Sequence, residues 1–101
     1  MKKKHQKEIA KNEFRKNKKN NHPSYIFARV GNDYKYLGLT HAEITDGIKN
    51  IKLDKNPNPK DSRPAFIKPK SEKSKTNNFK KKQREWVLSK KDKEKISKLK
   101  K

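Results

Sequence analysis

Cysteine is absent from this chain of 101 residues, so disulfide bonds, cysteine-ligated zinc sites and thiol catalysis are excluded. Glycine is scarce, and none of the three glycines belongs to a glycine-rich phosphate loop. The three histidines, His5, His22 and His41, are too widely separated to show a spacing typical of zinc sites. We therefore expect neither a metal site nor any other cofactor.

Apolar residues are also in short supply. They make up 27% of the chain, against an ordinary share of roughly 45–50%. No apolar run approaches the roughly 18 residues that suggest a membrane span, so none is expected. The first residues are positively charged but lead into no apolar stretch, which argues against a signal peptide. We therefore expect a cytoplasmic protein with one small domain at most.

Charge, by contrast, is abundant and mostly positive: 31 Lys and Arg residues against 11 Asp and Glu residues give a net charge of +20. Residues 1–20 carry +7 and residues 68–101 carry +11, whereas residues 21–67 carry only +2 and hold 17 apolar residues. This distribution predicts a nearly neutral folded centre between cationic flanks. We expect residues 1–21 to form a basic helix or arm, and residues 22–101 to form a single small domain.

The basic residues are mostly lysines, because only four of the 31 are arginines. Lysine presents a point charge on a flexible stem, whereas arginine presents a planar fork of hydrogen-bond donors. A lysine-rich surface therefore suits the phosphate backbone of RNA or DNA better than it suits base recognition. Two other interpretations stay open: the lysines keep the protein in solution, or they attract an anionic membrane surface.

Residues 5–19 lack glycine and proline, and the spacing of Ile9, Ala10 and Phe14 places them on one helical face. Cations gather toward the end of this stretch, as the helix dipole favours. The pattern predicts an N-terminal helix that docks on the core through its apolar face. The helix is expected to end before Pro23, because the residue preceding a proline avoids the helical region.

Residues 24–30 and 34–39 are rich in aromatic and β-branched side chains, and the Gly-Asn-Asp sequence between them is typical of a turn. Together they predict an antiparallel hairpin. Alternation along the first strand separates two sets of side chains. One set is Tyr25, Phe27 and Arg29, and the other, which we expect to face the core, is Ile26, Ala28 and Val30.

The region after the hairpin predicts several short elements. Thr40 and Glu43 have the spacing of a capping box, so a helical turn is expected over residues 41–46. Strands are expected over residues 48–54 and 64–68, with a stiff, proline-framed loop over residues 56–64 between them.

The C-terminal part begins with residues 70–78, which have no apolar member and predict a mobile loop. Residues 84–88 predict a strand, with a helix as the alternative. Ser89 and Asp92 again have capping-box spacing and predict a basic helix over residues 90–100. The whole pattern predicts an α+β fold, with a four- or five-stranded antiparallel sheet, N-terminal and C-terminal helices and Lys-rich tails.

His41 is the leading candidate for a catalytic group, because the end of a strand aims a side chain rigidly and histidine transfers protons near neutral pH. Metal-free RNA cleavage through the 2′-hydroxyl needs a base, an acid and cations that stabilise the charged phosphorane. Arg63 and Thr45 are the other catalytic candidates, and His22 is a second proton-transfer group. The aromatic residues expected to stack on a base are Tyr25, Tyr36 or Trp86.

Cations on the expected sheet, in the proline-framed loop and in the lysine run at 80–82 are candidates for contact with nucleic-acid phosphates. They are Arg29, Lys35, Lys60, Arg63, Lys80, Lys81, Lys82 and Arg84. Several candidates also have plainer interpretations, which do not involve a ligand. These are a surface position for His41, a cap for Thr40, a core position for Trp86 and, for Arg63, an ion pair with Asp61 or Asp54.

Several stretches together resemble small proteins of bacterial mobile elements. They are the hairpin leading into Leu37-Gly-Leu-Thr-His41, the Asn-Pro-Asn-Pro-Lys-Asp61 loop, the Pro-Ala-Phe-Ile67 strand and the Trp-Val-Leu-Ser89 segment. In element order and composition, residues 22–88 are similar to the barnase–EndoU–colicin–RelE group of compact ribonucleases. The resemblance implies an N-terminal helix before a curved antiparallel sheet, and RNA cleavage by side chains on that sheet. The residues it points to are His41, Arg63 and the lysines.

The function we favour from the sequence is binding to RNA or DNA through the phosphate backbone, with affinity that falls steeply as salt rises. Two alternatives stay open. One is a metal-independent endoribonuclease of the toxin type that uses His41. The other is a phage or mobile-element module that inhibits a protein or ribosome-associated partner.

Overall fold

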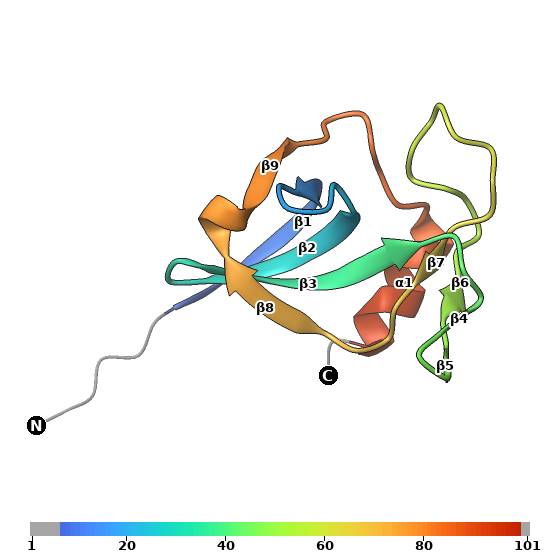
Figure 1. Cartoon of the computed structure of the whole chain (residues 1–101), viewed down its shortest axis with the longest axis horizontal. Helices are drawn as coiled ribbons and strands as arrows, with labels where there is room; N and C mark the ends of the chain where they lie inside the picture. Colours follow the sequence, from blue (N-terminus) through green and yellow to red (C-terminus); the bar gives the residue numbers. More distant parts are fainter. Residues whose placement is uncertain (1–6, 100–101) are drawn as a thin grey trace, which may run out of the picture.

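The computed structural model describes residues 7–99 as an antiparallel seven-stranded sheet, a separate two-stranded hairpin, one 3₁₀ helix and one α-helix (Figure 1). The strands of the large sheet are β1 (Glu8–Asn17), β2 (Pro23–Val30), β3 (Asp33–Thr40), β6 (Ile51–Lys52), β7 (Phe66–Ile67), β8 (Glu72–Lys75) and β9 (Phe79–Lys82). The hairpin consists of β4 (Ile44–Thr45) and β5 (Ile48–Lys49), and the helices are η1 (Thr76–Asn78) and α1 (Lys90–Leu99).

The three long strands β1, β2 and β3 form the centre of the sheet as a continuous meander. Phe14 of β1 lies opposite Tyr25 of β2, which in turn lies opposite Leu37 of β3. Three large apolar side chains therefore meet across the sheet, which is where cross-strand packing stabilises a sheet most. The predicted hairpin of residues 24–30 and 34–39 is confirmed by β2 and β3.

Strand β3 carries two further strands on its other edge. β7 pairs with its end at Leu39 and Thr40, whereas β8 pairs with its beginning, from Asp33 to Tyr36. The chain then passes through η1 into β9, which pairs with β1 on the opposite side of the meander. The sheet is therefore strongly curved, and its two edges are joined directly by η1 (Figure 1).

Apolar side chains are buried on both faces of β2. The larger cluster joins the sheet to α1 and consists of Phe14, Tyr25, Phe27, Ala28, Leu37, Leu39, Leu53, Ala65, Ile67, Leu88 and Ile96. The smaller cluster consists of Ile26, Tyr34 and Phe79, with Tyr36 packed against it. Because both faces are covered, the sheet buries more apolar area than a sheet with one solvated face.

The expectation that only Ile26, Ala28 and Val30 face the core was wrong. Tyr25 and Phe27 lie in the larger cluster. Of the three residues expected to face the core, only Ile26 lies in the smaller cluster. A register shift between Ile26 and Ala28 explains why Ala28 joins Phe27, because a bulge interrupts the strict alternation of side chains.

The predicted N-terminal helix was also wrong, because residues 8–17 form β1, with β2 on one side and β9 on the other. Phe14 is buried, whereas Ile9 is 52% exposed, so the two do not share an apolar face. An apolar stripe this thin is a weak helix signal, and pairing with a strand on each side outweighs it. Residues 5 and 6 of the expected helix lie outside the described part of the chain.

No helical turn forms over residues 41–46. Asp46 and Gly47 instead connect β4 to β5. Their φ angles are positive, at 52° and 78°, which is the backbone conformation favoured in two-residue hairpin turns. The expected strand over residues 48–54 is divided into β5 and β6 at Asn50. The buried amide of Asn50 donates hydrogen bonds to the Ala42 carbonyl at 3.0 Å and to the hydroxyl of the neighbouring Thr45 at 2.8 Å.

Residues 70–78 are not a loop, because they contain β8 and η1. Residues 84–88 are neither strand nor helix, and the last strand is β9. The expected count of four or five strands is therefore too low, and α1 is the only α-helix of residues 7–99. The helix predicted over residues 90–100 is confirmed for its described part, and the Asp92 N–H donates to the Ser89 hydroxyl at 3.2 Å.

Candidate functional site

The loop of residues 56–64, which the sequence predicts, lies against the end of β3 and is held by its own side chains. Asn56 accepts a hydrogen bond from the Asn58 N–H at 2.9 Å, and Asn58 accepts one from the Lys60 N–H at 3.0 Å. Asn56 also donates to the Arg63 carbonyl at 2.9 Å, which closes the loop. Asparagine turns of this kind, alternating with prolines that fix φ, make the loop a rigid platform.

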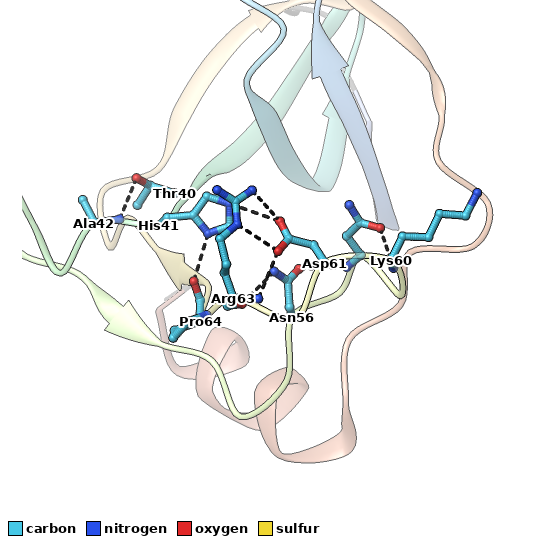
Figure 2. Close-up of polar contacts among 9 residues, drawn as sticks. Thr40, His41, Ala42, Asn56, Lys60, Asp61, Arg63 and Pro64 are labelled. Atoms are coloured by element: carbon cyan, nitrogen blue, oxygen red, sulfur yellow. Dashed lines mark hydrogen bonds and ion pairs between the residues drawn. The ribbon is translucent and has the colours of Figure 1, made fainter.

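Asp61 and Arg63 form a two-bonded ion pair on this platform (Figure 2). The guanidinium donates from Nε to Oδ1 at 3.0 Å and from Nη2 to Oδ2 at 2.9 Å, and the Arg63 N–H also donates to Oδ1 at 3.0 Å. These hydrogen bonds lower the pKa of Asp61 to about 2, and Asp61 in turn raises the pKa of Arg63. The ion pair that the sequence offered as the plainer interpretation of Arg63 is therefore confirmed.

His41 follows β3 directly and faces the same loop (Figure 2). Its Nδ1 lies 2.9 Å from the Pro64 carbonyl, and its Nε2 lies 3.3 Å from Oδ2 of Asp61. A neutral imidazole can donate from only one ring nitrogen, whereas the protonated ring donates from both. Both ring nitrogens of His41 therefore face oxygen atoms of the loop.

His41 also lines a hollow of about 190 Å³, which we call the histidine hollow. Its other lining residues come from the beginning of β2, the end of β3, the proline-framed loop and the segment between β9 and α1. They are His22, Pro23, Leu39, Thr40, Asn56, Asn58, Asp61 and Trp86. Two histidines that are separated by 18 residues in sequence are thus brought to one site, because β2 and β3 are antiparallel neighbours.

His22 differs from His41 in its contacts. Its backbone N–H donates to Asn20 at 3.0 Å, but its exposed ring has no hydrogen-bond partner within residues 7–99. An imidazole without a fixed partner is free to contact a bound molecule. The hollow therefore holds one histidine that the loop holds in place and one whose ring is free.

The remaining candidates for chemistry and stacking lie elsewhere. Thr45 belongs to the β4–β5 hairpin and accepts a hydrogen bond from Asn50, and it does not line the histidine hollow. Tyr25 is 4% exposed and donates to Asn12, and burial raises its pKa, so its ring is a core component. Tyr36 is half-buried against Phe79, and its pKa is raised by burial and by the neighbouring Glu72 carboxylate.

Four cations form a second feature, which we call the cationic strip. Arg15 of β1 and Lys81, Lys82 and Arg84 at the end of β9 line one shallow open hollow. The Arg15 guanidinium is fixed by an ion pair with Glu13 at 2.6 Å and lies over the Tyr34 ring at 5.1 Å. The strip thus combines one guanidinium that is held in place with three exposed cations in and just after β9.

The other cations expected to contact phosphates are dispersed. The Arg29 guanidinium donates to the Gly31 carbonyl, Lys35 pairs with Glu8 at 2.8 Å, and Lys80 donates to Asn21 at 2.7 Å. The Lys60 side chain extends away from the Asp61 cluster (Figure 2). None of these four lines the cationic strip.

Sequence reasoning missed several residues of both features. Asn56 and Asn58 escaped attention, although alternation of asparagine with proline is a recognisable signal for side-chain-capped turns. Arg15 was missed because its segment was expected to be a helix. Trp86 was not missed, since it was expected either to stack on a base or to be a core residue; it packs on Phe14, with ring centroids 5.8 Å apart, and it also lines the hollow.

Within residues 7–99 no cluster of three or more His, Asp or Glu side chains is suited to hold a metal ion. The same residues contain no helix that is long and apolar enough to cross a membrane. Comparison with protein-family models, curated proteins and solved structures finds no match to this chain. The function has therefore to be argued from the geometry of the two features.

Proposed function

We propose that this protein binds RNA by contacting the phosphate backbone of the RNA. The cationic strip carries the proposal, because it gathers Arg15, Lys81, Lys82 and Arg84 around one open hollow. Guanidinium and ammonium groups on an accessible surface are the groups that contact phosphate oxygens. The combination of an oriented Arg15 with lysines, whose charge sits on a flexible stem, also suits a backbone of variable conformation better than it suits a fixed small anion.

The rest of the charge distribution supports this proposal. Among the described lysines and arginines, only Arg15, Lys35, Arg63 and Lys95 form ion pairs with carboxylates. The net charge of +20 is the excess of basic over acidic residues, so the protein's own carboxylates cannot neutralise it. Such a surface attracts a polyanion, and its binding releases condensed counterions from the nucleic acid.

The test is to measure the affinity of a fluorescent single-stranded RNA by anisotropy between about 50 and 200 mM salt. We expect log K to fall linearly with log salt, with a slope of about −0.7 for each phosphate contact on single-stranded RNA. An affinity that is independent of salt would contradict the proposal.

A second candidate function is metal-independent RNA cleavage, which one observation favours: His22 and His41 line the same hollow. In this reaction His22 takes the proton of a 2′-hydroxyl, and the 2′-oxygen attacks the adjacent phosphorus. The bond from phosphorus to the 5′-oxygen breaks, and protonated His41 donates its proton to that oxygen. The products are a 2′,3′-cyclic phosphate and a 5′-hydroxyl, and no metal is needed.

This candidate is tested by incubating the protein with RNA and with a matched oligonucleotide that has a single ribonucleotide within DNA, both in the presence of a chelator. We expect cleavage of both substrates and none of an all-DNA control, since only a 2′-hydroxyl supplies the nucleophile. His22→Ala and His41→Ala should each abolish cleavage. Intact RNA, or equal cleavage by the His41→Ala variant, would remove this function while leaving RNA binding in place.

A further inference from the structure

The cationic strip and the histidine hollow are consecutive along the chain. Lys81, Lys82 and Arg84 lead through Glu85 into Trp86, whose side chain lines the hollow. The Lys16 ammonium, next to Arg15 of the strip, lies 5.8 Å from the centre of the Trp86 ring. A polyanion that lies along the strip is therefore led directly to the hollow.

The lining of the hollow combines two kinds of group. Pro23, Leu39 and Trp86 supply apolar surface, and Leu39 and Trp86 also pack in or against the main core. Asn58, Asp61 and the histidines supply polar groups. Within the described part of the chain the amide Nδ2 of Asn58 has no hydrogen-bond partner, because Asn58 is engaged only through Oδ1 and its backbone. Apolar surface together with a few polar groups suits a flat ring with a polar edge.

The size of the hollow restricts what it can hold. At about 190 Å³ it is smaller than the sites of roughly 300–1,000 Å³ that enclose drug-sized ligands. It suits a single ring system, with the rest of the ligand outside. Arg63 does not line the hollow, but it is ion-paired to Asp61, which does. Its side chain is 69% exposed and bonds Asp61 only through Nε and Nη2, so Nη1 is available to a part of the ligand outside the hollow.

We infer that the histidine hollow binds one unpaired nucleobase of a single-stranded RNA, whose flanking phosphates lie on the cationic strip and at Arg63. Trp86 provides the stacking surface, and Asn58 and His22 contact the edge of the base. Stacking on an aromatic ring is the usual way in which single-stranded nucleic acid is held, and it tolerates different bases. This inference rests on the proposed function, because it takes RNA as the ligand and adds where its base is bound.

Trp86 is the only tryptophan of the chain, so its fluorescence reports on the hollow alone. The test is to titrate the whole protein with uridine 5′-monophosphate, ribose 5-phosphate and inorganic phosphate at one ionic strength, exciting where nucleotides do not absorb. We expect saturable quenching by the nucleotide and none by the two phosphates. No saturable change with the nucleotide, or an equal change with ribose 5-phosphate, would overturn the base site.

His22→Ala provides the matched variant, because the His22 ring is exposed and makes no hydrogen bond in the described structure. We expect it to bind the nucleotide about tenfold more weakly, with an unchanged circular dichroism spectrum. An unchanged nucleotide affinity would place the base elsewhere. The double variant Lys90→Gln/Lys91→Gln is the matched control, because it changes exposed lysines of α1 that line neither the hollow nor the strip, and it should bind the mononucleotide as the parent does.

Titrations of the parent protein with RNA and with the nucleotide show which of the two proposals has failed. If RNA binds the parent protein with strong salt dependence but the nucleotide does not quench Trp86, the base site is wrong and RNA binding stands. If the nucleotide quenches Trp86 but an RNA oligomer binds no more tightly than the mononucleotide, the backbone-binding function is wrong and the hollow is a mononucleotide site instead.

Discussion

Asp61 holds Arg63 through two parallel hydrogen bonds, from Nε to Oδ1 at 3.0 Å and from Nη2 to Oδ2 at 2.9 Å. The same Oδ2 lies 3.3 Å from Nε2 of His41. One carboxylate thus orients two groups that can each interact with a phosphate, and it presents to Arg63 the paired oxygens that a phosphate would present. Removal of Asp61 should therefore affect both the stability of the loop and its affinity for anions.

The pH dependence of this loop follows from the lowered pKa of Asp61. Its value of about 2 in the folded protein lies below the ordinary 3.8, so the folded state binds the proton less readily than the unfolded state. The contribution of Asp61 to stability is therefore complete above about pH 4 and is lost as pH falls toward about 2. We expect the melting temperature of the parent to exceed that of Asp61→Asn at pH 6 and the difference to disappear near pH 2. A difference that is the same at both pH values would show that the carboxylate charge does not stabilise the loop.

Asp92 anchors α1 to the segment after β6. Its fully buried carboxylate accepts hydrogen bonds from the backbone N–H groups of Asp54 at 2.7 Å and Lys55 at 3.2 Å. Asp92→Ala would leave both donors without a partner, which should lower the free energy of unfolding by about 2–4 kcal/mol. Lys91→Ala, at an exposed position of the same helix, should change it by less than about 0.5 kcal/mol. Urea denaturation of the three proteins measures both values, and similar stabilities for the two variants would contradict this role.

Those parts of the fold that depend on local pattern could be predicted from the sequence. The β2–β3 hairpin has two β-rich runs and a Gly-Asn-Asp turn, and α1 has a Ser89 cap, so neighbouring residues determine both. β8 could not be predicted, because its partner β3 is distant in sequence. β1 could not be predicted either, because its few apolar residues give no strand pattern, although it pairs with the neighbouring β2 as well as with the distant β9. β8 has no buried residue and is held by pairing with the edge of β3, which leaves no apolar signal in residues 72–75.

The candidate site divides in the same way. His41, Arg63 and their partner Asp61 were identified from the end of a strand and a proline-framed loop, which are local features. The convergence of His22 with His41 depends on the register of β2 against β3, and the place of Trp86 depends on how residues 83–89 cross from β9 to α1. These relations are tertiary, and a single sequence carries no signal for them.

Phe14 tests whether β1 is an integral part of the sheet. Its ring is 1% exposed and lies between Tyr25 and Trp86, with ring centroids at 5.2 and 5.8 Å. Phe14→Ala should lower the free energy of unfolding by about 3–5 kcal/mol, the usual effect of removing a buried phenylalanine. Ile9→Ala is the control on the same strand, because Ile9 is 52% exposed and should contribute less than about 1 kcal/mol. A stable, well-folded Phe14→Ala protein would mean that the segment behaves as a detachable arm.

The cationic strip makes the last prediction, which concerns salt dependence rather than affinity alone. The triple variant Lys81→Gln/Lys82→Gln/Arg84→Gln removes three charges from the strip, so the slope of log K against log salt for single-stranded RNA should become shallower by about 2. The matched control replaces three exposed lysines of α1, Lys90, Lys91 and Lys93, by glutamine.

Both triple variants have the same net charge, so a general electrostatic attraction would weaken equally in the two proteins. Direct phosphate contacts at the strip would instead reduce the slope in the first variant and leave it nearly unchanged in the second. Equal slopes in the two variants would mean that RNA is attracted by the whole charge of the protein, and that the strip has no special part in binding it.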